Sequence, residues 1–325
     1  MVIEVSNLKK VYKTHKRDSG ILNAVKSVFW RKYEEKEALK GISFSIKGGE
    51  IIGLIGPNGA GKSTTIKALS GVLHPTSGTI KCLGYIPWKQ RKKYVKNIGV
   101  VFGQKEQLWW DLPPMDTFIF NRDIYDIPRK AFDKRLKSML QMLKIEGVAK
   151  TPVRDLSLGE RMKAKLIAAL LHNPKLVFLD EPSIGLDVIA KGRMRDFITE
   201  VNKRHKTTFI ITTHDMQDIE RLCKRVIIIN HGKIIYDGLL SRIKDKVMCC
   251  KVINVKFSKW NKRFKFRGCK IISKDDYELK IEVNLKNQNI RAVIGHLITN
   301  YEFVDLFVTD PPIEEIIAKI YDRRQ

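Results

Sequence analysis

The sequence is poor in cysteine, and its cysteines do not have the spacing of a structural site. The 325 residues include five cysteines, and no two of them form a C-x-x-C pair. An odd number of cysteines in a chain of this length is a poor basis for a disulfide framework. We therefore expect the protein to work in a reducing, cytoplasmic environment.

Long apolar runs and repeats are also missing. No apolar run approaches the length of about 20 residues that spans a bilayer. The first residues, MVIEVSNLKKVY, are typical of a strand and not of a signal peptide. Neither an internal repeat nor a low-complexity tract is present. If the protein acts at a membrane, we expect another chain to supply the membrane part.

Acidic residues are scarce relative to basic ones. The sequence has 61 Lys and Arg against 35 Asp and Glu, a formal net charge of +26. This excess indicates a polyanionic partner, such as nucleic acid or an anionic membrane surface, but a generally lysine-rich composition explains it equally well. The hydrophobic fraction of 43% is ordinary for a globular protein, and the length predicts one large domain and a smaller one.

The order of sequence patterns predicts an α/β protein with two domains. Residues 1–12 alternate in the manner of an edge strand, residues 13–37 form a basic insertion, and strands then resume. Between residues 100 and 240, the runs KLVFLD, TFIIT and RVIIIN alternate with helical patterns, which predicts a mostly parallel sheet covered by helices. Beyond residue 238 lysine-rich strands begin and a helix, IEEIIAKIYDRR, is predicted at the end, so we place a domain boundary there.

The clearest chemical motif is GPNGAGKST at residues 56–64. It fits the pattern G-x-x-x-x-G-K-[ST], follows the apolar run EIIGLI and opens a predicted helix. Its glycines let the backbone curl around phosphates, Lys62 supplies charge to the β- and γ-phosphates, and the Ser63 hydroxyl can bind Mg²⁺. The predicted nucleotide-binding residues are Gly56, Pro57, Asn58, Gly59, Ala60, Gly61, Lys62, Ser63 and Thr64.

A second motif, KLVFLDE, is a buried-type strand that ends in two carboxylates. Beside a P-loop, Asp180 would hold Mg²⁺ through water, and Glu181 would position or deprotonate the attacking water. Alone, an Asp-Glu pair before Pro182 would be more typical of a simple turn at a strand end. The neighbouring P-loop favours the functional interpretation.

A third motif, LSLGE, is an anion site that lacks a lysine. Ser157 and Gly159 lie just before the helical pattern ERMKAKLIAALLH, in which Met162, Leu166, Ala169 and Leu170 share one face. The N–H groups at such a helix start favour a phosphate. The motif by itself does not indicate whose phosphate it binds.

Together with Gln104 in VVFGQ, SIGLD at 183–187 and His214 in TTHD, these motifs resemble an ATP-binding cassette ATPase, the nucleotide-binding subunit of ABC transporters. The resemblance covers residues 1–238. It implies a P-loop NTPase fold with a RecA-like core, an antiparallel β subdomain and a helical subdomain at about 105–172, followed by a small C-terminal α+β domain at 239–325. It also implies a dimer that holds two ATP molecules head to tail, so that LSLGE caps the γ-phosphate bound by the other subunit.

The resemblance assigns further roles. Gln104 would contact Mg²⁺ and sense the membrane partner, His214 would contact the γ-phosphate, Asp187 would cross the dimer interface, and Tyr12 would stack on adenine. Their plainer interpretations are a solvated loop residue, a core histidine, a helix cap and a strand-surface aromatic, respectively.

The phosphate-capping motif departs from the commonest family form. Leu158 and Glu160 stand where Gly and Gln are most frequent, and Ser183 replaces a usual Thr. Ser157 and Gly159, which have the residue types expected to contact phosphate, are retained. Together with Glu160 they complete the predicted capping site.

Narrower features resemble the ATPases of ABC-2-type exporters, which include drug and viologen efflux systems. These features are the basic insertion, the run VVFGQKEQLWWDLPPMDTF and a single cassette with a C-terminal extension. The insertion could lie on anionic lipid or a membrane subunit, or pack on its own domain as a solvated helix. Trp109 and Trp110 are a candidate anchor for the permease, although we expect at least one of them to lie in the core.

This resemblance implies ATP and Mg²⁺ as cofactors and a homodimer, or a heterodimer with a paralogous ATPase. It implies separate transmembrane permease subunits at the cytoplasmic face of the membrane. The alternative is a soluble cassette ATPase that acts on ribosomes or nucleic acid. Such proteins carry two cassettes, zinc modules or coiled coils, and here there is one cassette with neither a C-x-x-C pair nor a long heptad tract, so no nucleic-acid partner is expected.

Overall fold

A computed structural model describes residues 1–15, 33–103, 105–213, 215–247, 250–258, 264, 266, 268–285 and 287–311. Gln104, His214, most of the basic insertion and the helix predicted after Pro312 lie outside these residues. The chain divides into two compact units, Met1–Gly238 and Leu239–Gln325.

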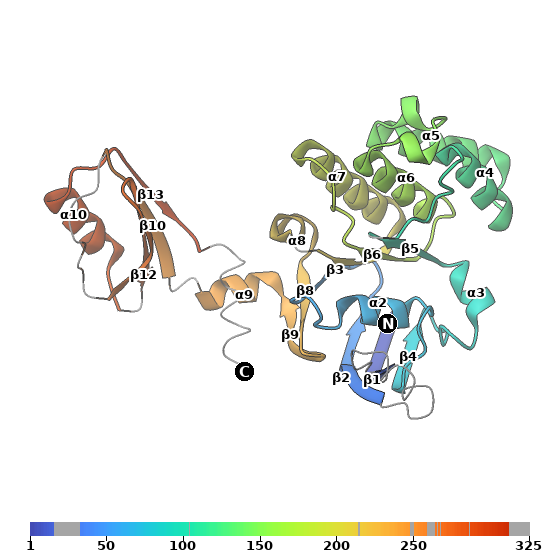
Figure 1. The fold of residues 1–325 in the computed structure, drawn as a ribbon, viewed down its shortest axis with the longest axis horizontal. Helices are drawn as coiled ribbons and strands as arrows, with labels where there is room; N and C mark the ends of the chain where they lie inside the picture. Colours follow the sequence, from blue (N-terminus) through green and yellow to red (C-terminus); the bar gives the residue numbers. More distant parts are fainter. Residues whose placement is uncertain are drawn as a thin grey trace, which may run out of the picture. The chain divides into compact units, whose positions relative to one another are not determined.

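The first unit is built on a sheet of six strands (Figure 1). In spatial order the strands are β5 (Ile98–Phe102), β6 (Leu176–Asp180), β7 (Thr208–Thr212), β3 (Ile51–Ile55), β8 (Arg225–Asn230) and β9 (Lys233–Leu239). The four pairings from β5 to β8 are parallel. Every residue of β7 is buried, as expected for a strand with helices on both faces. The predicted parallel α/β sheet is therefore confirmed.

Helices follow the strands along the chain and form the other layers of this unit. They are α2 (Lys62–Leu69), α3 (Arg91–Val95), α4 (Pro114–Ile124), α5 (Arg129–Leu143), α6 (Leu158–Leu170), α7 (Val188–His205) and α8 (Met216–Leu222), with short 3-10 turns at Glu146–Val148 and Val153–Asp155. On α5 the residues at helical spacing, Phe132, Leu136, Met139 and Leu143, are buried. On α6 the expected face is buried at Met162, Leu166 and Leu170 and half-buried at Ala169.

A smaller antiparallel sheet has the order β2-β1-β4, formed by β2 (Tyr33–Ile46), β1 (Ile3–His15) and β4 (Ser77–Cys82). The first strand is therefore central, and the expectation of an edge strand is wrong. Alternation reports only that one face is buried, as it is at Ile3 and Val5, and does not tell whether both edges are paired.

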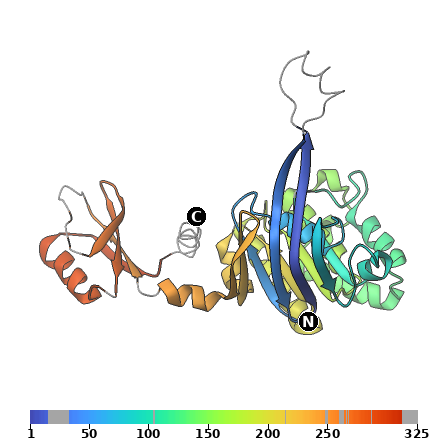
Figure 2. The ribbon, with the colours of Figure 1, turned by 90° about the horizontal axis from the view of Figure 1, so that it is seen from below.

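The long β1–β2 hairpin projects beyond the sheet (Figure 2). Its strands include residues 13–15 and 33–37, which the sequence analysis had placed in the insertion. Neither segment shows an apolar–polar alternation, because residues 13–15 are Lys-Thr-His and residues 34–37 are Glu-Glu-Lys-Glu, so the sequence pattern did not separate them from the insertion. The pairing sets Tyr12 opposite Lys36.

The second unit is a small α+β domain. Its antiparallel sheet has the order β11 (Cys269–Lys274), β12 (Glu278–Asn284), β10 (Cys250–Lys256) and β13 (Asp305–Thr309), and its helices are α9 (Leu240–Val247) and α10 (Ile290–Asn300). Val293 and Leu297 of α10 share one apolar cluster with Ile253, Val255 and Ile281 of the sheet. Within the described ranges of both units, no helix is long and apolar enough to cross a membrane.

Candidate functional site

The P-loop connects β3 to α2, so that the first N–H groups of the helix face the loop. Gly61 caps the helix with φ +114°, which a side chain would strain, and a Cβ there would lie 2.8 Å from the Ala38 carbonyl oxygen. Lys62 Nζ donates to the carbonyl oxygens of Gly56 at 2.7 Å and Pro57 at 3.0 Å. The loop thus holds its lysine in place.

The electrostatics of Lys62 suit an anionic ligand. The side chain is only 6% exposed, and burial lowers its pKa, although the nearby carboxylates of Glu181 and Asp180 act in the opposite direction. A bound phosphate would add negative charge beside the ammonium group and favour its charged form. The lysine is therefore placed to gain more from a phosphate than an exposed lysine would.

Oxygen atoms suited to a magnesium ion meet where β6 ends beside the P-loop. Ser63 Oγ donates to Asp180 Oδ1 at 3.2 Å, and Thr212 Oγ1 donates to the same oxygen at 2.6 Å. No cluster of three or more His, Cys, Asp or Glu side chains suited to a metal occurs in the part of the chain that the structure describes. Mg²⁺ commonly binds through one or two protein oxygens together with phosphate and water, so Ser63 and Asp180 fit this ion.

Glu181 has a left-handed backbone, with φ +57°. This conformation costs a non-glycine residue roughly 1–3 kcal/mol and clusters at functional sites. Thr212 of β7 holds the residue there, because Glu181 N–H donates to its carbonyl oxygen at 2.9 Å and to its Oγ1 at 3.1 Å. The strained turn places the carboxyl group at the edge of the cleft.

A cleft of about 1110 Å³ joins these elements. It is lined by residues of the β1–β2 hairpin, the P-loop and α2, the end of β5, and the end of β6: Tyr12, Lys13, Lys36, Ala38, Asn58, Gly59, Gly61, Lys62, Ser63, Thr64, Lys67, Phe102, Gly103, Lys105, Asp180, Glu181 and Ile184. The structure therefore brings Tyr12 to the predicted site despite the insertion after it. The sequence analysis missed Lys13 and Lys36, whose placement depends on the hairpin register.

The LSLGE turn lies outside this cleft, at the start of α6. Ser157 caps the helix, and Glu160 N–H donates to its Oγ at 3.2 Å. In return the Glu160 carboxylate accepts from Ser157 N–H at 2.9 Å and from Ser157 Oγ at 2.7 Å. Through this capping box, the N–H groups of Ser157 and Glu160 find hydrogen-bond partners within the turn itself. None of Ser157, Gly159 and Glu160 lines the cleft of its own chain.

Asp187 is the N-cap of α7, and its Oδ1 accepts from Ala190 N–H at 2.7 Å. Asp187 is therefore a helix cap, which was its plainer interpretation. Its expected role across a dimer interface stays a prediction.

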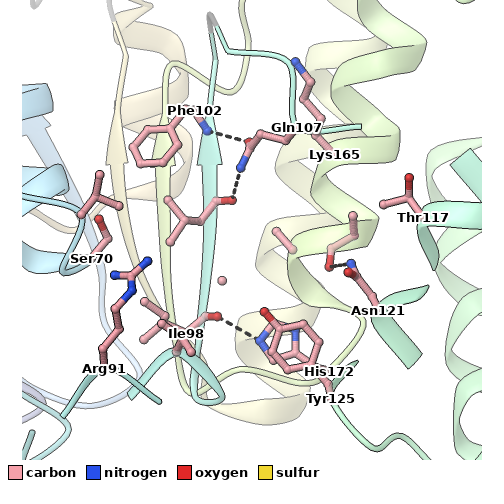
Figure 3. A pocket seen from close by; sticks show the side chains of 16 residues that line it. Ser70, Arg91, Ile98, Phe102, Gln107, Thr117, Asn121, Tyr125, Lys165 and His172 are labelled. Atoms are coloured by element: carbon pink, nitrogen blue, oxygen red, sulfur yellow. Dashed lines mark hydrogen bonds between the residues drawn. The ribbon is translucent and has the colours of Figure 1, made fainter. Parts of the chain in front are cut away.

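The side chains of Gln107 and Lys165 anchor the residues on both sides of position 104. The Gln107 amide accepts from Phe102 N–H at 2.9 Å and donates to Val100 O at 3.2 Å, so it pairs with the edge of β5 (Figure 3). The nearly buried Lys165 of α6 donates to Lys105 O at 2.9 Å. The residues that flank position 104 are thus tied to β5 and to α6. Gln107 was missed, because no motif distinguishes it from a solvated glutamine.

A second hollow, of about 310 Å³, lies beside β5 (Figure 3). Thr117 and Asn121 of α4 line it together with Tyr125, the C-cap of that helix, and His172, which follows α6. The His172 ring stacks on Tyr125 at 3.9 Å between centroids, and its Nε2 donates to Ile98 O at 2.9 Å. Because a carbonyl oxygen can only accept, the proton of the neutral ring is on Nε2.

Because His172 is buried, we expect the folded protein to lose stability in acid. Burial lowers its pKa from the usual 6.5 to about 4, the Ile98 hydrogen bond opposes this shift and Arg135 adds to it. The unfolded chain therefore takes up a proton near pH 6.5 while the folded protein does not. The free energy of unfolding should have its full value above pH 6.5, and it should be about 2 kcal/mol lower at pH 5 than at pH 7. Urea unfolding at both pH values should show this loss in the native protein and a smaller one in His172→Asn. Equal losses in the two proteins would contradict the assignment.

Both tryptophans of the WW pair are exposed, by 43% for Trp109 and 49% for Trp110. The expectation that at least one lies in the core is therefore wrong. Trp109 packs on Phe120 of α4 with 4.7 Å between ring centroids, and Arg161 lies 5.1 Å from the Trp110 ring centroid. Leu112, Ile119, Phe120 and Ile124 of the helical subdomain are also exposed, and together with the two tryptophans they are here called the tryptophan patch.

Comparison with known proteins agrees with this geometry. Residues 39–184 match the family described as ABC transporter. The linearmycin resistance ATP-binding protein LnrL of Bacillus subtilis (strain 168) is 29% identical over 299 residues, which are 90% of this chain and 96% of that protein. The Nod factor export ATP-binding protein I of Burkholderia orbicola (strain AU 1054) is 34% identical over 225 residues, 69% of this chain and 73% of that protein.

Solved structures show the same fold. A structure of an ATP-binding subunit of an ABC transporter has a TM-score of 0.65 and 24% identity, and the match covers 76% of this chain and 93% of that one. The cbiO1 protein from Clostridium perfringens, part of the ABC transporter complex cbiONQ, has a TM-score of 0.59 and 27% identity, with 76% of this chain and 94% of that one covered.

Proposed function

Because the chain belongs to the ATP-binding proteins of ABC transporters, we propose that it works as a head-to-tail dimer whose ATP-driven closure powers a separate membrane permease. One observation carries this proposal. The P-loop, Asp180 and Glu181 share a cleft, whereas the phosphate-capping turn of the same chain lies outside it. Each chain thus presents two complementary half-sites that a second copy would complete.

The protein is an ATPase, and we assign the catalytic roles within it as follows. Lys62 and the N–H groups at the start of α2 hold the β- and γ-phosphates. Mg²⁺, held by Ser63 and Asp180 when bound, would neutralise phosphate charge. Glu181 positions the attacking water and accepts its proton, and the Thr212 hydrogen bonds keep its backbone in place for that role. Tyr12 at the cleft mouth stacks on the adenine base.

Three further residues complete the proposed closed site. Gln104 would contact Mg²⁺, His214 would contact the γ-phosphate, and Asp187 would cross the interface. The anchoring of residues 105 and 107 to α6 and β5 supports a linking role for Gln104, because a shift of the helical subdomain would move the loop at the cleft edge.

The similar proteins suggest the type of permease. One is named for linearmycin resistance and another for Nod factor export, so we infer that this chain drives export of a small molecule. The tryptophan patch is the proposed docking surface, since exposed, adjacent aromatic side chains are typical interface anchors. Docking there would hold this protein at the cytoplasmic face of the membrane.

Membrane fractionation tests the docking surface. When the protein is expressed together with its permease, it should sediment with membranes, and Trp109→Ser with Trp110→Ser should reduce the bound fraction at least about tenfold. Tyr277→Ser, which removes an aromatic that is 64% exposed in the second unit, serves as the matched control and should bind normally. Recovery of the native protein with ribosomes or nucleic acid instead would favour the soluble ATPase alternative.

A further inference from the structure

The segment between β4 and β5 carries a group of basic side chains that the nucleotide site does not use. No Asp or Glu occurs between Glu50 and Glu106, whereas this stretch holds nine Lys and Arg. Five of them are exposed on α3 or beside it and are here called the α3 cluster: Lys89, Arg91, Lys92, Lys93 and Lys96. None of the five lines the nucleotide cleft, so ATP binding does not account for them.

The α3 cluster keeps its positive charge. Within the described parts of the chain, Lys89, Lys92 and Lys93 form no ion pair with a carboxylate. Lys96 pairs with Asp126 at 3.2 Å, but both side chains are more than half exposed, so water and salt weaken this pair. Arg91 Nη1 donates to Gly71 O at 2.7 Å, which orients the guanidinium group without neutralising it. The cluster therefore attracts polyanions.

Apolar side chains are exposed beside these cations. The Arg91 hydrogen bond ties α3 to the turn that carries Val72, which is 57% exposed. The Lys96–Asp126 pair joins α3 to the end of α4, where Ile124 belongs to the tryptophan patch (Figure 1). Cations around exposed apolar side chains are typical of a surface that lies on lipid, because the apolar groups enter the headgroup boundary while the cations stay among the phosphates.

Nucleic acid is the other polyanion that such a charge could serve. Proteins that bind single strands stack the bases on aromatic side chains. The aromatic residues of this segment are not available for stacking. Tyr94 is fully buried and donates to Leu69 O at 2.7 Å. Trp88 is half-buried against His74, with 4.9 Å between the ring centroids. The combination of free cations, inward-facing aromatics and an exposed valine favours lipid.

We propose that the α3 cluster, with Val72, is a binding surface for anionic lipid headgroups. The ammonium and guanidinium groups contact headgroup phosphates, and each of them adds to the attraction toward an anionic leaflet. That this leaflet faces the protein in the cell rests on the proposed function. There the tryptophan patch would dock on the permease, and the α3 cluster would hold the same end of the first unit against the surrounding lipid.

Vesicle binding by the purified full-length protein, without a permease, tests this surface. The partition coefficient on phosphatidylcholine vesicles that contain about 30 mol% phosphatidylglycerol should exceed that on pure phosphatidylcholine about a hundredfold or more. Raising the salt concentration from about 0.1 M to 1 M should abolish the difference, because the Debye length falls from about 10 Å to 3 Å. Lys92→Gln with Lys93→Gln should lower the coefficient on anionic vesicles about thirtyfold.

The matched control is Lys81→Gln with Lys203→Gln, which removes the same charge from exposed lysines of β4 and α7. Its partition coefficient should stay within about twofold of the native value. Val72→Ser should lower the coefficient about threefold, because it removes apolar contact and leaves the charge unchanged. All these variants should hydrolyse ATP at the native rate, which verifies that they are folded.

An RNA oligonucleotide distinguishes the two polyanions. At a phosphate concentration equal to that of the accessible phosphatidylglycerol, it should not displace the protein from the vesicles. Displacement would assign the α3 cluster to nucleic acid and overturn the proposal. Equal losses in the Lys92–Lys93 and Lys81–Lys203 variants, or equal binding to both vesicle types, would also overturn it. A protein that fails to bind vesicles but follows its permease to the membrane would contradict the lipid surface alone and leave the proposed function standing.

Discussion

Lys62→Ala should reduce ATP hydrolysis about a hundredfold or more and weaken ATP binding. The substitution removes the ammonium group that the P-loop holds through the carbonyl oxygens of Gly56 and Pro57. No other cation in that loop can replace it, because the remaining residues of GPNGAGKST are uncharged. The β- and γ-phosphates would thus lose the positive charge that the P-loop holds beside them. Steady-state phosphate release and fluorescent-nucleotide binding measure the two effects.

Lys81→Ala is the matched control for Lys62→Ala. Lys81 is an exposed lysine of β4 and does not line the cleft, so its removal should leave both turnover and binding unchanged. Because Lys62 is buried, the melting temperature of Lys62→Ala is needed to show that the variant is folded. A folded Lys62→Ala protein with near-normal turnover would exclude the P-loop as the catalytic phosphate site.

Glu181→Gln should bind ATP but hydrolyse it about 10²- to 10⁴-fold more slowly, because the amide cannot accept the proton of the attacking water. The side chains are almost equal in size, and the hydrogen bonds from residue 181 N–H to Thr212 involve only the backbone of that residue. The phosphate and Mg²⁺ ligands therefore stay in place. The closed state should accumulate, so gel filtration with ATP and Mg²⁺ should show a stable dimer.

Glu4→Gln, an exposed glutamate of β1, is the control and should hydrolyse ATP at the native rate without accumulating a dimer. Chemical crosslinking provides a second measure of association for short-lived dimers. If Glu181→Gln remains monomeric by both methods while it binds ATP, closure of two chains around the nucleotide is wrong. If it turns over ATP at the native rate, Glu181 is not the base.

The sequence could predict those parts of the site whose residues lie together in one short motif. The P-loop and the end of β6 each combine a buried strand with chemically specific residues, and both lie in the cleft as expected. Tyr12 could be named only by family resemblance. Its neighbour Lys36 could not be named, because their pairing depends on hairpin register across residues that carry no alternating pattern.

Other errors arose where burial depends on distant parts of the chain. Alternation in the first strand shows a buried face, but the pairing of its second edge with β4 is a long-range contact. Trp109 and Trp110 are large apolar residues that would usually be placed inside, yet they lie on the surface of the helical subdomain.

ATP hydrolysis by a mixed dimer of Lys62→Ala and Ser157→Arg chains tests the head-to-tail site most directly. Each homodimer should be inactive, because one lacks the phosphate-binding lysine and in the other a large cation fills the capping turn. In the mixed dimer, the intact Lys62 of one chain faces the intact Ser157 of the other and completes one site. The chains are co-expressed with different tags, purified through both and assayed for phosphate release. Activity at least about tenfold above either homodimer is predicted; mixed dimers no more active than the homodimers would contradict a site shared between two chains.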